Sequence, residues 1–347
     1  MLRFVIASLT PMALIALACL LGGLWPALAL LYMTVFVSLA DRLGPEALPE
    51  IEGAERAANR LSVTLGLAHL LLLPLGVWAI AAGPELSPSG GVLTGLALGL
   101  FLGQVSHPNA HELIHRPARG LRRLGVAVYV TLLFGHHASA HPKVHHVHVA
   151  TDRDPNSARL GEGVYRFFLR AWLGSFLAGF RAETAARARR SSGARGPHPY
   201  AVYLGGAAAT LAAAGLLAGW RGVAVLGALC AYAQAQLLLA DYVQHYGLRR
   251  SVDATGKAEP AGPQHSWNAP QWYSSSLMLN APRHSDHHQN PGRHFPALRL
   301  DDRMPLLPRP MPIMAVIALV PPLWRRIMDR RARAWAAAPP GKAPPAR

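Results

Sequence analysis

Residues 91–115 read GVLTGLALGLFLGQVSHPNAHELIH, so that an apolar segment runs directly into a histidine motif. Residues 91–106 contain no charged side chain and are predicted to lie in a membrane. His111 and His115 follow four residues apart, so on a continuing helix their imidazoles share one face. Two imidazoles placed in this way can bind one metal ion. The sequence therefore predicts a membrane helix that carries metal ligands just beyond the membrane.

The composition of the whole chain also indicates a membrane protein. Of its 347 residues, 51% are hydrophobic and 15% are charged, whereas soluble domains average about 25% charged residues. Long apolar stretches predict an all-α integral membrane protein with about six transmembrane helices in three hairpins. These stretches lie near residues 4–24, 25–40, 61–82, 91–106, 200–219 and 222–240. The first is interpreted as a retained helix, not a signal peptide, because the next stretch is equally apolar.

Other parts of the chain are expected to lie around this bundle. Residues 124–135 are too short to span a membrane, and residues 164–180 carry arginines between apolar side chains, as interfacial helices do. Residues 311–324 contain three prolines and are expected at the periphery. We expect residues 1–325 to form a single membrane-embedded domain. The basic tail at 326–347 ends in the low-complexity sequence APPGKAPPAR and is expected to be disordered.

Positive charge indicates how the chain crosses the membrane. The formal net charge is +16, but membrane proteins concentrate Lys and Arg on the cytoplasmic side, so nucleic acid is not the expected partner. The first two hairpin turns contain no Lys or Arg, whereas residues 181–195 and the chain after 325 are rich in Arg. Both termini and the histidine-rich segments 107–160 and 241–300 are therefore predicted to be cytoplasmic. Anionic lipid and an acidic protein are the expected partners of this basic surface.

Further histidines follow the first motif. His141 and His145 are four residues apart and are expected to share one helix face, while His146 would point toward a second metal ion. In a third cluster, His284 and His287 are expected to share a face, with His288 beside them.

His245, just after the last predicted span, brings the total to nine imidazoles. Because a zinc ion takes at most four ligands, nine imidazoles suit two metal ions. Imidazole binds zinc, copper, iron or nickel, so the spacing alone leaves the metal open. Cys19 and Cys230 lie in apolar runs without a CxxC partner, so they are expected to be buried thiols and not a disulfide or metal site.

Two other classes of protein are weighed against this interpretation. The HExxH pattern at 111–115 occurs in zinc proteases, in which Glu112 would be the general base, but six or more clustered histidines would then have no role. A metal transporter would carry its polar ligands at mid-membrane, whereas these histidines lie at the ends of the spans.

Several strings make the chain resemble the integral-membrane alkane 1-monooxygenases, within the larger membrane fatty acid desaturase and hydroxylase group. They are HELIHR at 111–116, HxxxHH at 141–146, VATDRDP at 149–155, HYGL at 245–248 and RHSDHH at 283–288. The resemblance runs from about Leu61 to Arg299. HYGL separates this family from generic desaturases, which mostly lack it.

The resemblance implies an activity, a cofactor and partners. A bacterial inner-membrane enzyme would use O2 to hydroxylate the terminal methyl group of an alkane, giving a 1-alkanol. Electrons would pass from NAD(P)H through a reductase and a separate rubredoxin, since a fused rubredoxin needs four cysteines in CxxC pairs. The alternative is a desaturase or hydroxylase of the same group that acts on fatty acyl chains or other lipids. Two irons would be bound by His111, His115, His141, His145, His146, His245, His284, His287 and His288.

Residues around these ligands carry further expectations. The family often has Glu where this chain has Ala140 and Gln244, so other carboxylates are candidates to orient a ligand histidine by a hydrogen bond. They are Glu112, Asp241 and Asp286; an ordinary Asp-Pro turn explains Asp152 and Asp154 equally well. His69, inside a span, is expected to bond one helix to another. Six further histidines are expected either next to the ligand histidines or at the surface: His107, His136, His137, His148, His265 and His294. Seven glycines permit either close helix packing or a slot for an apolar chain: Gly66, Gly76, Gly95, Gly99, Gly103, Gly205 and Gly206.

Overall fold

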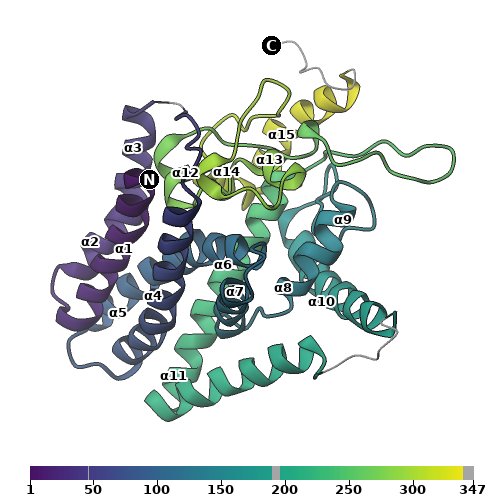
Figure 1. Ribbon diagram of the computed structural model, residues 1–347. Coiled ribbons are helices and arrows are strands. Elements are labelled where there is room, and N and C mark those ends of the chain that lie inside the picture. The colour runs from purple at the N-terminus through teal and green to yellow at the C-terminus, as the bar shows by residue number, and fades with distance from the viewer. Residues whose placement is uncertain (46, 190–195, 339–347) are drawn as a thin grey trace.

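The protein is helical throughout the part of the chain that its computed structural model describes, which is residues 1–45, 47–189 and 196–338. Two isolated β-bridges, Val252–Ala258 and Asn268–Leu306, are the β-structure found there. Helices therefore form the whole framework (Figure 1), and the predicted all-α fold is confirmed.

Five helices in the described residues are long and apolar enough to cross a membrane, so this is an integral membrane protein. The first is α1 (Leu2–Leu21), and the third is α4 (Glu55–Ala82). The second and fourth each contain a π-helical turn, and the fifth is the 47-residue α11 (Pro199–His245). The second comprises α2 (Trp25–Leu31), η1 (Tyr32–Phe36) and α3 (Val37–Leu43), and the fourth comprises α5 (Pro88–Phe101), η2 (Leu102–Ser106) and α6 (His107–Ile114).

Helix α11 replaces two of the six predicted spans. The stretches at 200–219 and 222–240 were expected to be separate, but they join at an elbow where Ala218 and Gly219 leave the helical conformation. Gly219 adopts φ 59°, which glycine accepts without strain, so no polar loop is needed for the change of direction. The first half runs across one end of the bundle and the second half rises into it (Figure 1). The second half ends at His245.

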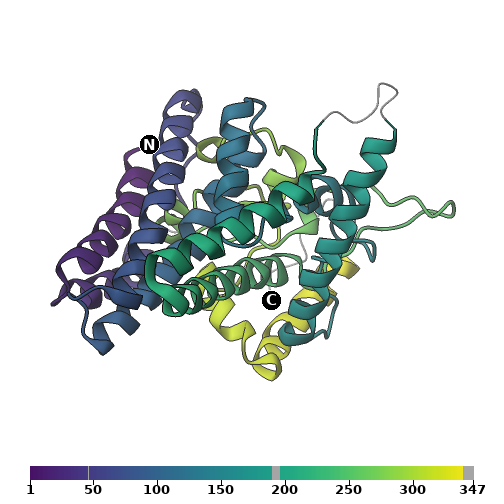
Figure 2. The ribbon, with the colours of Figure 1, turned by 90° about the horizontal axis from the view of Figure 1, so that it is seen from below.

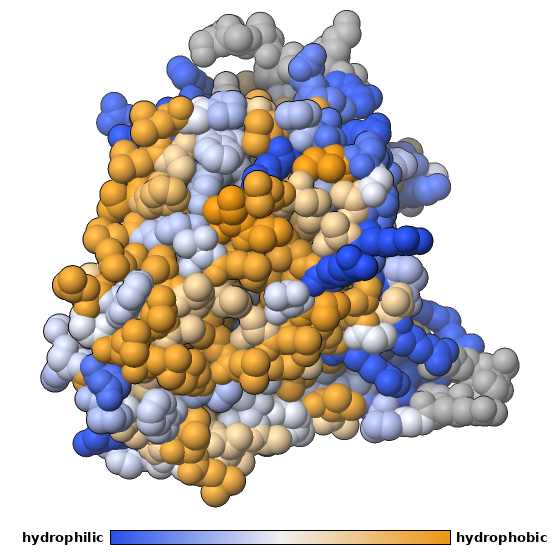
Figure 3. Space-filling model, turned by 60° about the vertical axis from the view of Figure 1, so that its left-hand side comes forward, coloured by the Kyte–Doolittle hydropathy of each residue, from blue (hydrophilic) through white to orange (hydrophobic). Residues whose placement is uncertain are grey.

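The turn between α1 and α2 and the turn between α4 and α5 lie at one end of the molecule (Figure 1). Gly22, in the turn after α1, lies so close to the turn before α5 that a Cβ atom would clash with the backbone oxygen of Glu85. Both termini of the described chain lie toward the other end (Figure 1). Seen from below (Figure 2), the N-terminal helices form one side of the bundle and α11 crosses its middle. The face formed by the N-terminal helices is broadly apolar (Figure 3), as expected for a surface in contact with lipid.

Shorter helices complete the structure. Helix α7 packs on α6 and α4, α10 on α8 and α11, and α14 on α11, so each covers part of the histidine-bearing segments. Their bounds are α7 (Arg119–Thr131), α8 (His137–Ala140), η3 (His141–His145), α9 (His146–His148), α10 (Val164–Ala188), η4 (Pro263–His265), α12 (Trp272–Leu277), α13 (His284–Gln289), η5 (Phe295–Ala297), α14 (Met311–Ala318) and α15 (Pro321–Ala337).

The prediction of a disordered tail is wrong for its first part. Residues 326–337 belong to α15, which buries Trp324, Met328 and Ala332 at intervals of four, along one face. The amphipathic pattern outweighs the high charge of this segment, because the arginines occupy the opposite, exposed face. Residues 339–347 of the predicted tail, and residues 190–195 of the Arg-rich segment, lie outside the described residues.

Candidate metal centre

The structure brings the nine predicted histidines together from four segments of the chain. Helix α6 and the residue after it supply two, η3 and α9 supply three, the last residue of α11 supplies one, and α13 supplies three. Their ring nitrogens form two groups, within each of which all ligand atoms lie within 4.8 Å of one another. We call these the five-histidine group (His111, His115, His141, His146 and His287) and the four-histidine group (His145, His245, His284 and His288).

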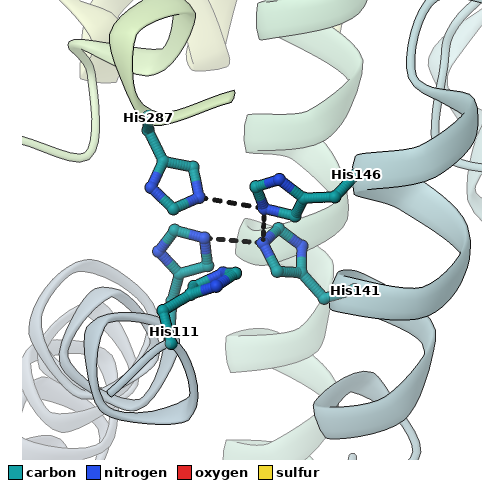
Figure 4. A group of neighbouring side chains, drawn as sticks. His111, His141, His146 and His287 are labelled. Atoms are coloured by element: carbon teal, nitrogen blue, oxygen red, sulfur yellow. Dashed lines mark hydrogen bonds between the residues drawn. The ribbon is translucent and has the colours of Figure 1, made fainter. Parts of the chain in front are cut away.

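The five-histidine group has the spacing of ligands around a common ion. The Nε2 atoms of His111 and His141 are 2.7 Å apart, those of His141 and His146 are 2.9 Å apart, and those of His146 and His287 are 3.0 Å apart (Figure 4). With metal–nitrogen bonds of about 2.1 Å, two ligands at right angles would lie about 3.0 Å apart. The rings come from three different segments and converge on one point (Figure 4), as metal ligands do.

The four-histidine group shows the same spacing. The Nε2 atom of His284 lies 3.0 Å from that of His245 and 3.1 Å from that of His288. The Nε2 atoms of His115 and His145 are buried and have no hydrogen-bond partner among the described residues. A buried nitrogen without a partner costs free energy unless something binds it, so both groups fit a metal ion.

Helix geometry divides the histidines differently from the prediction. His141 and His145 were expected to share a metal, but a π-helical turn runs from His141 to His145. A π-helix aligns residues five apart, so His141 shares a group with His146, and His145 faces the other group.

In the α-helical α13 the predicted pairing is wrong for a similar reason. Residues four apart align there, so His284 joins His288 and His287 belongs to the five-histidine group. The predicted pair His111 and His115 does share one group.

One carboxylate among the described residues contacts a histidine of these groups. The Oδ2 atom of Asp154 lies 2.9 Å from the Nδ1 atom of His145, and both side chains are buried. Burial opposes ionisation, but the contacts with His145 and Ser157 hold the pKa of Asp154 below its ordinary value. The sequence offered Asp154 as a candidate but gave equal weight to an Asp-Pro turn.

The three other candidate carboxylates have different partners. Glu112 lies 3.5 Å from the Arg116 guanidinium, and Asp286 accepts hydrogen bonds from Arg293 and from the Arg299 backbone N–H. Asp241 accepts a 2.6 Å hydrogen bond from Asn156. These three therefore stabilise the segments around the site, and none bonds directly to a ligand ring in the described structure.

Burial also affects the protonation of several of these imidazoles. Burial, reinforced by neighbouring imidazoles, lowers the pKa of His141, His287 and His288 well below the ordinary value. These rings are therefore neutral at neutral pH, and each keeps a lone pair for a metal ion.

The positions that depart from the family pattern are packed without a carboxylate. Ala140 lies against α10, where a Cβ atom on Gly179 would be 3.1 Å from that of Ala140. The Gln244 side chain donates a 3.2 Å hydrogen bond to the Ala281 backbone oxygen, which ties α11 to the loop before α13. Neither residue contacts a ligand ring through a hydrogen bond.

The remaining histidines occupy three kinds of position. His107 and His137 are buried and line a cavity beside the site, and His136 packs against Trp172. His148 and His294 are partly exposed, and His265 lies 3.3 Å from Glu259. His69 links α4 to its neighbours, as predicted: its two ring nitrogens each lie 3.0 Å from a hydroxyl oxygen, those of Ser106 and Thr131.

Two small cavities lie between the histidine groups and α14. One, of about 70 Å³, is bordered by His111, His141 and His284. The other, of about 100 Å³, is bordered by Met278 on one side and by Met311 and Ala315 of α14 on the other. The two share five lining residues: Gly103, Pro108, Ala240, Gln244 and Ala281. The two cavities therefore adjoin along these residues and make a candidate passage, whose inner end is lined by histidines of both groups.

Comparison with known proteins places the chain in a family. Residues 87–314 match the fatty acid desaturase family, so the chain belongs to it. It is 31% identical to alkane 1-monooxygenase 2 of Alcanivorax borkumensis over 69% of this chain and 63% of that protein. It is 32% identical to alkane 1-monooxygenase 1 of the same organism over 90% of this chain and 79% of that protein. It is 29% identical to alkane 1-monooxygenase 2 of Pseudomonas aeruginosa over 90% of this chain and 85% of that protein. The resemblance to this family that the histidine motifs indicated is confirmed.

Proposed function

We propose that this protein hydroxylates the terminal carbon of alkanes, using O2, at a di-iron centre bound by the nine histidines. The observation that supports this most directly is the convergence of nine imidazoles into two groups at the inner end of an apolar passage. The similarity to several alkane 1-monooxygenases supports the substrate class.

The chain supplies the ligands and the surroundings of the two irons. When bound, they would activate O2 with two electrons, so that one oxygen atom enters the substrate and the other leaves as water. The five-histidine and four-histidine groups would each bind one iron through neutral imidazole. Aromatic and aliphatic side chains around the site, such as Phe134 and Leu237, would keep bulk water from the reacting carbon.

The passage would bind the alkyl chain by burial alone. An alkane has no polar group, so its affinity comes from apolar contact, about 0.8 kcal/mol per CH2. Substrate would enter from the lipid beside α14, pass Met278 and Ala240, and reach the histidine groups methyl-first. Of the glycines considered for such a slot, Gly103 borders both cavities, while Gly66, Gly76, Gly99 and Gly206 face neighbouring side chains that a Cβ atom would strike.

Electrons would come from a separate protein. We propose a rubredoxin, itself reduced by an NAD(P)H-dependent reductase, because the chain has two cysteines and both are buried. An acidic partner would be attracted to a chain with a net charge of +16. We place the histidine groups and both termini on the cytoplasmic side of a bacterial inner membrane, and the basic surface with them.

A second candidate is a desaturase or hydroxylase of fatty acyl chains. The match to the fatty acid desaturase family favours it as the alternative, because the same metal chemistry serves both reactions. The two candidates differ in substrate and product, so one assay distinguishes them.

The test is turnover by the purified protein with NADH, a reductase and a rubredoxin, supplied with octane, hexadecane or a free fatty acid. Formation of 1-alkanol from the alkanes is the expected result, with two irons per chain. Desaturated or hydroxylated fatty acid as the main product would favour the alternative. Equal oxidation at internal and terminal carbons would contradict methyl-first entry.

A variant tests the site in the same assay. His284→Ala removes a ligand of the four-histidine group, so turnover should fall below detection and iron content should drop to about one per chain. Membrane insertion should be unchanged. The matched control is His148→Ala, at a partly exposed histidine outside both groups, which should retain activity and iron.

A further inference from the structure

The two histidine groups are not equivalent. In the four-histidine group every ring is buried, whereas His111, His115 and His146 of the five-histidine group are partly exposed. A metal in the four-histidine group has one protein donor fewer, so its affinity depends more on each ring. The orientation of those four rings is therefore decisive.

His145 differs from the eight other rings in what holds it. Among the residues that the structure describes, it is the one ring of either group with a carboxylate at hydrogen-bonding distance, from Asp154 at 2.9 Å. In its own group, the buried Nδ1 atoms of His284 and His288 have no side chain at hydrogen-bonding distance within the described part of the chain, and that of His245 lies 3.5 Å from the Ser266 hydroxyl. His145 is thus the anchored member of the four.

Asp154 is itself held rigidly. The Ser157 hydroxyl donates a 2.6 Å hydrogen bond to Oδ2, and the Asn156 backbone N–H donates one of 3.0 Å to Oδ1. The Ser157 hydroxyl also accepts a 2.8 Å hydrogen bond from the Ala150 backbone N–H, close after α9. The carboxylate therefore has a fixed position relative to η3 and α9.

This arrangement decides which nitrogen of His145 is free. A carboxylate at Nδ1 keeps the proton there and leaves the lone pair on Nε2. That Nε2 atom is buried, has no other partner among the described residues and belongs to the four-histidine group. Its ring lies 4.8 Å, centroid to centroid, from the rings of both His245 and His288.

We propose that Asp154 is a positioning residue that acts through His145 to set the metal affinity of the four-histidine group, without affecting the five-histidine group. The inference rests on the proposed function, in that each group binds one metal ion. Carboxylates behind a metal-binding histidine typically contribute about 10- to 100-fold in affinity. The two irons should therefore differ in how they respond to a change at residue 154.

The first test measures iron per chain in the full-length purified protein at increasing chelator concentrations. For Asp154→Ala, one of the two irons should be lost at a chelator concentration about 10- to 100-fold lower than in the unmodified protein. Asp154→Asn should lie between them, because its amide oxygen can still accept the Nδ1 proton. Asp152→Ala is the matched control, since Asp152 lies in the same loop but its side chain is 82% exposed and it pairs with Arg249 and Arg159. It should behave as the unmodified protein does.

The second test assigns the lost iron to a group. In a variant whose four-histidine group is emptied by His284→Ala and His288→Ala, adding Asp154→Ala should leave the remaining iron unchanged. In a variant whose five-histidine group is emptied by His111→Ala and His287→Ala, adding Asp154→Ala should release the remaining iron at the lower chelator concentration. Loss of iron from both backgrounds, or from the first alone, would overturn the inference.

Two further readouts keep the result decisive. If Asp154→Ala does not fold, Asp154→Asn preserves the turn, and its Mössbauer spectrum should show a change in one of the two iron signals. Unchanged signals and an unchanged chelator midpoint in Asp154→Asn would refute the role of Asp154. If the unmodified protein holds fewer than two irons, the proposed di-iron site fails instead, so the two failures are distinguishable.

Discussion

At the scale of single residues, the passage to the histidine groups has one narrow point. Gly103 and Ala240 border both cavities, so on the proposed path an alkyl chain moving from the α14 side to the histidine groups would pass between them. A Cβ atom on Gly103 would lie 2.4 Å from the Gln236 side-chain amide, which shows how little space is left there. On the proposed path, substrate access would therefore require small side chains at these two positions.

Ala240→Leu tests this narrow point. The three added carbon atoms would fill the junction of the two cavities without touching a histidine nitrogen, so iron should stay at two per chain. Formation of 1-alkanol should fall by about tenfold or more, because one extra methylene group in a hydrophobic pocket typically lowers kcat/KM by about 10- to 200-fold. Ala228→Leu, in a separate cavity bordered by Val92 and Tyr232, is the control and should retain turnover. Full activity in Ala240→Leu would mean that substrate takes another route.

At the scale of elements, helix α15 packs against the two residues that follow His245, Tyr246 and Gly247. Trp324 is fully buried, with ring centroids 5.4 Å from Tyr242 and 5.3 Å from Tyr246. The Tyr246 hydroxyl donates a 2.6 Å hydrogen bond to Asp329. Gly247 has φ 70°, and a Cβ atom there would lie 2.8 Å from that of Ala332, so only glycine allows this approach. Residues 246–247 of the HYGL string thus contact α15, directly after His245 of the four-histidine group.

Trp324→Ala should loosen this helix. Truncating a buried aromatic side chain typically costs about 3–5 kcal/mol, and here the loss falls on the contact between α15 and α11. The variant should unfold several degrees lower in detergent, and limited proteolysis should cut within residues 321–337 before the rest of the chain. Leu323→Ala, at a neighbouring apolar residue that is 42% exposed, should be far less affected. Equal protease resistance in the two variants would show that α15 is held by other contacts.

The sequence could predict some features of these elements and not others. Three histidine clusters follow from local spacing, His245 from its place just after a span and from the family resemblance, and His69 from the cost of a polar group in a span. Their division into two groups depends on a π-helical turn at 141–145, and the side chains carry no local signal for that turn. The elbow in α11 depends on Gly219 at positive φ. Because the chain has 32 glycines, the presence of a glycine alone did not mark this position as a bend. The role of Asp154 was ambiguous because a turn and a ligand support use the same residue type.

At the scale of the whole molecule, the turns and the histidine groups lie toward opposite ends. The close approach of Gly22 to Glu85 places the first two turns side by side, and the elbow of α11 lies at the same end of the bundle (Figure 1). The two groups are built from the opposite ends of the membrane helices, such as His245 at the last residue of α11.

This arrangement makes the orientation in the membrane testable with single cysteines. The native thiols Cys19 and Cys230 are each 1% exposed, so they should give little background labelling. In intact spheroplasts, a membrane-impermeant maleimide should label Glu85→Cys, in an exposed turn, because we place the turns on the periplasmic side. Gln289→Cys, exposed and next to His288, should be protected until the membrane is opened, because the positive-inside rule places the histidine groups in the cytoplasm. Labelling of Gln289→Cys with protection of Glu85→Cys would mean the reverse orientation, and labelling of both in intact spheroplasts would contradict the hairpin arrangement itself.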